Sequence, residues 1–137
     1  MCGIGGYYAF GKTRPYKEAI TKVFTSICSR GKDASGFAYV HGGEIVCVKA
    51  PIPSTELILR KEWKELELPK CLIFHTRAGT VGSNQNNANN HPLSDPSGVC
   101  IVHNGSIRGY EEMEKIWDYQ FRKEDQEVDS VGLLAAF

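Results

Sequence analysis

The sequence lacks any long hydrophobic run, and no stretch approaches the ~20 apolar residues that a membrane-spanning helix needs. It also lacks a basic N-terminal region followed by an apolar stretch and a cleavage site, as a secretory signal would require. Neither sign of charge is in excess, because 16 Lys and Arg balance 16 Asp and Glu. We therefore expect a cytoplasmic protein that binds neither nucleic acid nor membrane.

Short-spaced cysteine pairs are absent as well. The five cysteines are an odd number, which argues against a disulfide framework and favours a reducing compartment. Four of them lie in expected helices or strands and are predicted to be small buried hydrophobes: Cys28, Cys47, Cys71 and Cys100. The histidines lack the short spacing of zinc sites and are expected to make structural hydrogen bonds: His41, His75, His91 and His103.

The chain of 137 residues is long enough for one domain with a single core. Apolar periodicity and turn residues predict strands at 3–10, 36–40, 44–49, 71–75 and 99–103, the second and third forming a hairpin. Helices are predicted at 15–29, 54–68 (with Leu59, Trp63 and Leu66 on one face), 111–117 and from 129 onward. The polar segment 82–98 is predicted to be a loop, with closure of 84–90 over a ligand as the alternative.

The chain begins Met1-Cys2-Gly3, so removal of Met1 would make a cysteine the N-terminal residue. A free α-amine has a pKa of about 7.7 to 8.0 and accepts a proton near neutrality. A thiol, with a pKa of about 8.5, becomes a strong nucleophile once it loses its proton. Cys2 would then carry both a nucleophile and a base, whereas with Met1 retained its nitrogen is a non-basic amide.

Four segments place polar residues where irregular backbone meets a strand: Cys2, Arg30–Gly36, His75–Gly82 and His103–Gly105. With Asn90-His91-Pro92 and Asp129-Ser130, they resemble the class II glutamine amidotransferase domains of the N-terminal nucleophile hydrolase superfamily. The likeness runs from Cys2 to Asp129 and is closer to the glucosamine-phosphate synthase and amidophosphoribosyltransferase branch than to asparagine synthetase. It implies an α+β fold, an αββα sandwich of antiparallel sheets between helices. It also implies L-glutamine as the substrate, ammonia as the useful product, and no metal or organic cofactor.

The resemblance also implies roles for individual residues. Cys2 attacks the side-chain amide of glutamine and forms a γ-glutamyl thioester, while Asn104 and Gly105 stabilise the oxyanion and contact the substrate. Arg77 grips the α-carboxylate of glutamine, Asp129 pairs with its α-ammonium group, and Thr80 completes the binding site. Support for the site is assigned to Arg30, Asp33, His75 and His103, with a salt bridge expected between Arg30 and Asp33. Asn104-Gly105 as an ordinary hairpin turn remains an alternative.

Two positions depart from the family pattern, because Ala78 and Val81 stand where an aromatic residue and a histidine are usual. These two substitutions leave open how tightly and how specifically the site binds glutamine. The final helix stops at Phe137 with an apolar face, so we expect an incomplete domain, or an oligomer or partner that covers this face. The ammonia would pass to a separate synthase domain or protein. The alternatives are a non-catalytic glutamine-binding or regulatory module, or a hydrolase of the same superfamily that acts on another amide.

Overall fold

The computed structural model describes residues 1–116, 118, 120, 126–134 and 136–137. Its elements follow one another as β1 (Gly3–Tyr8), α1 (Lys17–Ser26), the 3-10 helix η1 (Ile27–Arg30), β2 (Ala34–His41), β3 (Glu44–Ala50), α2 (Ser54–Leu57), α3 (Lys61–Lys64), β4 (Cys71–Arg77), the 3-10 helix η2 (Asn87–Asn89), β5 (Leu93–Ser94), β6 (Cys100–Ile101), α4 (Tyr110–Ile116) and α5 (Val131–Leu134).

Four of these strands form an antiparallel sheet in the order β1-β4-β2-β3, and β5 and β6 form a second, smaller sheet. The register places Gly3 of β1 opposite Thr76 of β4, and Ala34 of β2 opposite Arg77 of β4. The start of β1, the start of β2 and the end of β4 therefore meet at one end of the large sheet. Three of the segments singled out in the sequence are brought together there.

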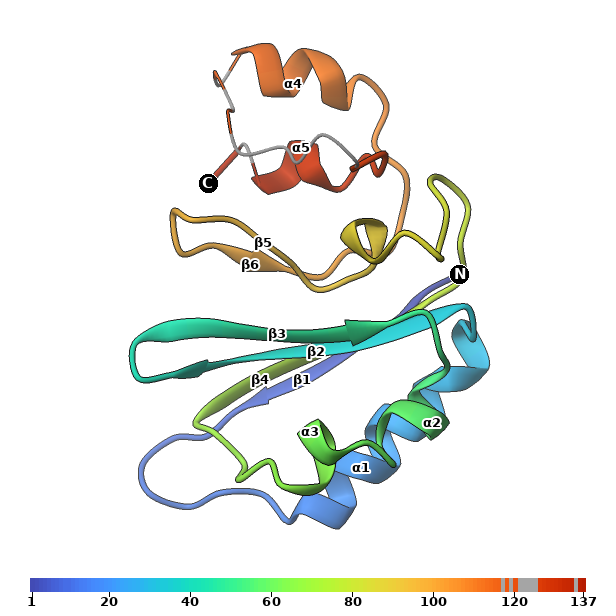
Figure 1. Cartoon of the computed structure of the whole chain (residues 1–137). Coiled ribbons are helices and arrows are strands. Elements are labelled where there is room, and N and C mark those ends of the chain that lie inside the picture. Colours follow the sequence, from blue (N-terminus) through green and yellow to red (C-terminus); the bar gives the residue numbers. More distant parts are fainter. Residues whose placement is uncertain (117, 119, 121–125, 135) are drawn as a thin grey trace.

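The elements are stacked in layers (Figure 1). Helices α1, α2 and α3 cover one face of the large sheet, the β5–β6 pair lies over the other face, and α4 and α5 lie beyond that pair. The α+β class is confirmed by this mixture of helices and antiparallel sheets. The assignment to an N-terminal nucleophile hydrolase sandwich stays a prediction.

Two hydrophobic clusters separate the layers. The larger one packs the helices against the large sheet and contains Phe24, Phe37, Trp63 and Phe74, whose rings meet at centroid distances of 4.9 to 5.1 Å. Aromatic pairs at this spacing stabilise a core beyond the area that they bury. The smaller cluster joins the β5–β6 pair to α5 and the residues before it, through Leu93, Val128, Val131 and Leu134.

The helix predicted over 54–68 is wrong in its length, because the structure has two short helices there, α2 and α3. Arg60 between them has an extended backbone with ψ 157°. This break turns Trp63 into the core, where it is 3% exposed and its Nε1 donates to Thr21 Oγ1 at 3.1 Å. Leu59, predicted on the buried face, is 62% exposed instead. Packing of one large side chain has overridden helical periodicity.

Other predicted helices and strands are present in the structure, but their first or last residues differ from the prediction. The 36–49 hairpin is confirmed by the pairing of β2 with β3, the first strand ends at Tyr8, and the first helix begins at Lys17. The strand expected over 99–103 is only Cys100–Ile101. The helix expected over 111–117 is α4, and the prediction for Trp117 lies outside the described residues.

The predicted polar loop 82–98 contains η2 and β5, and two of its asparagines, Asn89 and Asn90, are fully buried. The C-terminal apolar helix also differs from the expectation, because Val131 and Leu134 pack inside the chain. A partner is therefore not needed to cover those two residues, while Phe137 remains 84% exposed. The prediction for Ala135 lies outside the described residues.

Across the described ranges, we find no helix with the length and hydropathy to cross a bilayer. The same ranges contain no group of three or more His, Cys, Asp or Glu side chains placed to hold a metal ion.

Candidate active site

Cys2 lies at the end of the large sheet where β1, β2 and β4 meet. Gly3, its neighbour, approaches β4 and η1 so closely that a Cβ there would lie 2.6 Å from Thr76 Oγ1 and 2.8 Å from Ile27 O. A larger residue at position 3 would push the strand away. The small residue after Cys2 therefore lets the chain start pack directly against these two elements.

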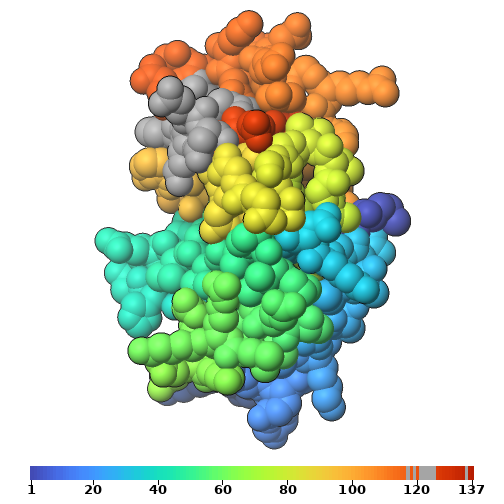
Figure 2. Space-filling view, turned by 45° about the vertical axis from the view of Figure 1, so that its right-hand side comes forward, coloured from blue at the N-terminus to red at the C-terminus, as the bar shows by residue number. Residues whose placement is uncertain are grey.

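Three segments hold Cys2 in place. Its backbone N–H donates to Asn104 Oδ1 at 3.1 Å, and its Sγ lies 3.7 Å from the carbonyl oxygen of Ala78 as a weak donor. Arg30 Nε donates to the carbonyl oxygen of Cys2 at 3.0 Å. In the space-filling view of Figure 2 the N-terminus (dark blue) reaches the surface between the yellow and light-blue segments. Cys2 is thus fixed in position at a half-buried site near the surface.

Arg30 and Asp33 support this site separately. The predicted salt bridge between them is not formed in the described part of the chain, because each side chain bonds to a different backbone group. Asp33 Oδ2 accepts from the N–H of Gly79 at 2.7 Å, and the N–H of Asp33 donates to Arg77 O at 3.0 Å. Asp33 therefore shapes the turn after β4, and Arg30 anchors the residue that carries the thiol.

A cavity of about 30 Å³ brings most of the predicted site residues together. Its lining comprises Cys2, Arg77, Ala78, Thr80, Val81, His91, His103, Gly105, Val128, Asp129 and Ser130. This volume is close to the share of one water molecule in liquid water. The residues predicted for catalysis and for binding thus face a common space, except Asn104, which is not part of its lining. In this state the space is too small for an amino acid.

Arg77 is 4% exposed and is held by the loop that follows it. Its Nη1 donates to Asn90 Oδ1 at 2.8 Å, and its Nη2 donates to the carbonyl oxygens of Val81 and of Gly82. A guanidinium group has five N–H donors, so these bonds leave two for a ligand. Burial lowers the pKa of Arg77, an effect that the nearby Cys2 and acidic groups oppose.

Asp129 is 8% exposed and lies two residues before the start of α5. Its Oδ2 accepts from the N–H of Ile107 at 2.6 Å, and its Oδ1 accepts from Ser130 Oγ at 3.3 Å. The first bond ties the carboxylate to the segment just beyond Asn104 and Gly105. A carboxylate with two oxygens retains lone pairs for a cationic ligand.

Three histidines lie together at the cavity, and two of them, His91 and His103, line it. His75 Nε2 bonds to the carbonyl oxygen of His103 at 3.0 Å, His103 Nδ1 bonds to Ser130 Oγ at 2.9 Å, and the rings of His75 and His91 lie 4.5 Å apart. Burial lowers the pKa of His75 to about 4 and that of His91 well below its usual value. Both rings are therefore neutral near pH 7. Structural hydrogen bonding was predicted for all four histidines, but neither nitrogen of buried His91 has a hydrogen-bond partner within the described residues.

Sequence reasoning missed a support at Lys49. This residue lies on β3, and its Nζ donates to Asn90 O at 2.6 Å and to Pro92 O at 3.0 Å. Asn90 Oδ1 in turn accepts from Arg77, so Lys49 fixes the segment that positions the guanidinium group. The Asn90-His91-Pro92 motif was visible in the sequence, but no local pattern connects it to a lysine on a strand 41 residues earlier.

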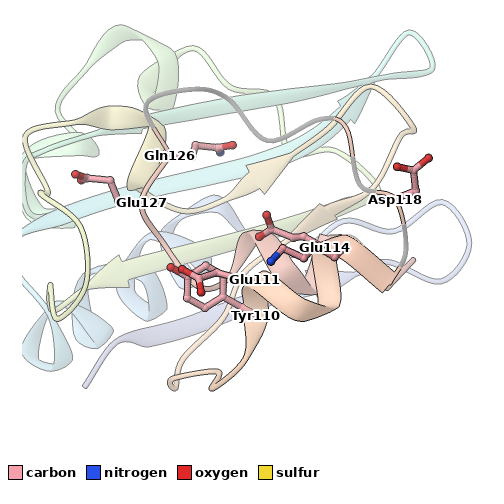
Figure 3. Close-up of a pocket in the computed structure, with 7 residues that line it drawn as sticks. Tyr110, Glu111, Glu114, Asp118, Gln126 and Glu127 are labelled. Carbon is pink, nitrogen blue, oxygen red and sulfur yellow. The ribbon is translucent and has the colours of Figure 1, made fainter.

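A larger cavity, of about 620 Å³, lies elsewhere and does not include Cys2. Figure 3 shows Glu111 and Glu114 of α4 lining it with Asp118, and Gln126 and Glu127 on the segment before α5. Its lining is predominantly acidic. We do not assign the substrate to it, because the predicted nucleophile faces the smaller space.

No family model matches the chain. It is 29% identical over 131 residues to a glutamine–fructose-6-phosphate aminotransferase (isomerizing) of Sulfurisphaera tokodaii, an alignment that covers 95% of this chain and 22% of the relative. Proteins of the same name from Staphylococcus aureus and Caldanaerobacter subterraneus are each 33% identical over 115 and 118 residues, covering 83% and 84% of this chain. The chain spans about a fifth of the length of these curated relatives.

Proposed function

This chain is a homologue of the glutamine–fructose-6-phosphate aminotransferases, and we propose that it is a glutamine-hydrolysing unit that releases ammonia for transfer to an acceptor. The homology supports a glutamine amidotransferase function and covers nearly the whole chain. The residue chemistry, the cysteine mechanism and the identity of the acceptor are our proposals. The homology does not favour a non-catalytic module or a hydrolase of another amide.

The observation that carries the proposal is the contact between Cys2 and Asn104. Asn104 Oδ1 accepts from the nitrogen of Cys2 at 3.1 Å, so the amide nitrogen of the same side chain is the end left to donate. We propose that this Nδ2 and the N–H of Gly105 bind the oxyanion that forms when Sγ attacks the amide carbon. One asparagine would then orient the base and stabilise the transition state.

Removal of Met1 is part of this proposal. Met1 is 80% exposed, and its removal would convert the nitrogen of Cys2 from an amide into a basic amine. The thiol gives its proton to this amine as Sγ bonds to the amide carbon. The proton then passes to the leaving nitrogen, which departs as ammonia, and water hydrolyses the resulting thioester to glutamate.

Arg77 and Asp129 would bind the two charged groups on the α-carbon of the substrate. Both line the cavity of Cys2 and retain capacity for a ligand, the first as a donor and the second as an acceptor. The α-carboxylate and the α-ammonium group of glutamine present the complementary charges. Selectivity for glutamine over shorter amides would follow from the distance between the groups that bind the α-carbon substituents and Sγ, which attacks the side-chain amide.

Glutamine binding requires the site to open, because the cavity has room for about one water molecule. The segment after β4 is the element to move, since Val81 and Thr80 line the cavity and are exposed at its rim. Its carbonyl oxygens at 81 and 82 are bonded to Arg77. The α-carboxylate would compete with these carbonyl oxygens for the guanidinium group, so binding and opening would be coupled.

The acceptor of the ammonia is proposed to lie on another domain or protein, because the relatives, which are named as aminotransferases, are about five times longer than this chain. That the domain continues beyond Phe137 stays a prediction.

The direct test of the proposed function is hydrolysis of glutamine by the purified chain, measured as glutamate and ammonia in equal amounts. Asparagine serves as the control substrate, and equal turnover of both amides would contradict glutamine specificity.

Asn104→Ala is expected to lower kcat for glutamine hydrolysis by about 10² to 10³-fold, because one oxyanion donor and the orienting contact to Cys2 are lost. Steady-state kinetics measure the change. Gln85→Ala is the control, since Gln85 is exposed and does not line the cavity of Cys2. Unchanged kcat in the Asn104 variant would place the oxyanion site elsewhere.

A further inference from the structure

Two cysteines that lie far apart in the sequence face each other between the two sheets. Cys47 lies on β3 of the large sheet and Cys100 on β6 of the small one, and their Sγ atoms are 3.7 Å apart. Ser94, which pairs with Cys100 across the β5–β6 ladder, has its Oγ 3.5 Å from Cys47 Sγ. Cys47 thus packs against both strands of the small sheet, and the five cysteines form no disulfide in this structure.

We propose that Cys47 and Cys100 form a reversible redox-modification site, in which a disulfide links the large sheet to the small one. A disulfide requires an S–S distance of about 2.05 Å, so the two sulfurs need to approach by less than 2 Å. We expect rotations of the two half-buried side chains to supply movement of that size. The site needs two cysteines on separate elements with adjacent sulfurs, and this pair meets both conditions.

Both cysteines are only half-buried, so a small oxidant can reach the pair. Cys100 also lines a cavity of about 230 Å³, with Cys71 and Ile73 among its other walls. The hydrogen bond with Cys47 and burial raise the pKa of the Cys100 thiol. A thiol with a raised pKa forms less of the reactive thiolate, so the proposal assigns the first attack to Cys47.

The chemistry is thiol–disulfide exchange with a small-molecule disulfide. The Cys47 thiolate attacks one sulfur of that disulfide, and the other sulfur leaves as a thiolate. Cys100, having lost its proton, then attacks Cys47 Sγ and releases the second small thiol. The two protein thiols lose two protons and two electrons in total, and the small disulfide is reduced to two thiols. Excess small thiol reverses both steps.

The cross-link would join two supports of the Cys2 site. Cys100 is three residues before His103, whose carbonyl oxygen bonds to His75 and whose ring bonds to Ser130. Cys47 is two residues before Lys49, which holds Asn90 and Pro92. Oxidation would therefore fix the 103–105 segment relative to the large sheet. A reversible bond of this kind is the form that disulfides take in reducing compartments.

The test is to equilibrate the full chain in buffers of varied oxidised-to-reduced glutathione ratio, alkylate the remaining thiols and map them by mass spectrometry. We expect one disulfide between Cys47 and Cys100, formed while Cys28 and Cys71 remain free. The oxidised chain should unfold about 5–10 °C higher, because the cross-link constrains the unfolded chain. Slower amide hydrogen exchange over 100–105 should accompany it.

Cys47→Ser and Cys100→Ser should each abolish the cross-link and the rise in unfolding temperature, whereas Cys71→Ser should keep both. Pairing of either cysteine with Cys28 or Cys71 would overturn the proposal. So would alkylation of both cysteines at every ratio, or a stable mixed disulfide with glutathione at Cys47. The mapping on the unsubstituted chain decides the question even if a variant does not fold. It does not depend on glutamine hydrolysis, so its failure leaves the proposed function standing.

Discussion

Replacing Cys2 with alanine is expected to lower kcat for glutamine hydrolysis by about 10⁴-fold or more, because no other nucleophile is proposed at the site. Alanine, like cysteine, is small enough for removal of Met1, so the variant would retain the α-amine and lose only the thiol. The fold should persist, since the hydrogen bonds that hold position 2 run mainly through its backbone N–H and carbonyl oxygen. Release of ammonia from glutamine measures the change.

The matched control for this prediction is Cys71→Ala. Cys71 is a half-buried thiol on β4 that does not line the cavity of Cys2, so its replacement should leave kcat unchanged. Calorimetric titration of the Cys2 variant with glutamine should still show binding through Arg77 and Asp129. Hydrolysis within about tenfold of the unsubstituted chain would rule out Cys2 as the nucleophile, since that corresponds to only about 1.4 kcal/mol of barrier.

Lowering the pH from 7 to 5 is expected to reduce the free energy of unfolding by about 2 kcal/mol through His75 alone. Burial, the main cause, lowers the pKa of His75 to about 4 in the folded chain. In the unfolded chain the pKa is near 6.5, so below that pH the unfolded state binds a proton that the folded state does not. Stability is therefore full above about pH 6.5 and falls as the pH approaches 4. His91, whose pKa burial also lowers, adds loss in the same direction.

Urea unfolding at pH 7, 6 and 5 measures this loss, in a range above the pKa of most carboxyl groups. His91→Asn should make the pH dependence shallower, because one of the two buried rings is gone. His41→Asn is the control, since His41 is exposed at the end of β2 and its replacement should leave the pH profile unchanged. A free energy of unfolding that does not change between pH 7 and 5 would contradict the buried neutral state of the pair.

Several features of the fold were predictable because their signals are local. The 36–49 hairpin follows from two β-rich runs separated by His41-Gly42-Gly43, and β2 and β3 pair as expected. The 54–68 segment shows where such signals fail. The spacing of Leu59, Trp63 and Leu66 fits one helical face, yet the contacts of Trp63 with Phe24 and Phe37 bend the chain at Arg60. Those contacts join residues distant in sequence, which periodicity does not record.

For the candidate site, too, only part could be predicted from the sequence. The polar residues at strand ends could be picked out, and the structure places Cys2, Arg77, Gly105 and Asp129 around one cavity. The interior position of Asn90 could not be predicted, because an asparagine-rich run is typical of a solvated loop. Here Arg77 and Lys49 satisfy its polar groups, which allows full burial. The Cys47–Cys100 contact depends on packing between two sheets, which spacing along the chain does not reveal.

The most direct test of the central claim is the intact mass of the purified chain before and after treatment with a diazoketone analogue of glutamine, which alkylates active-site cysteines. The account predicts loss of Met1 and a single adduct, mapped to Cys2 and prevented by excess glutamine. Retention of Met1, or a processed chain whose Cys2 takes no adduct, would contradict the claim that this residue is an activated nucleophile in a site shaped for glutamine.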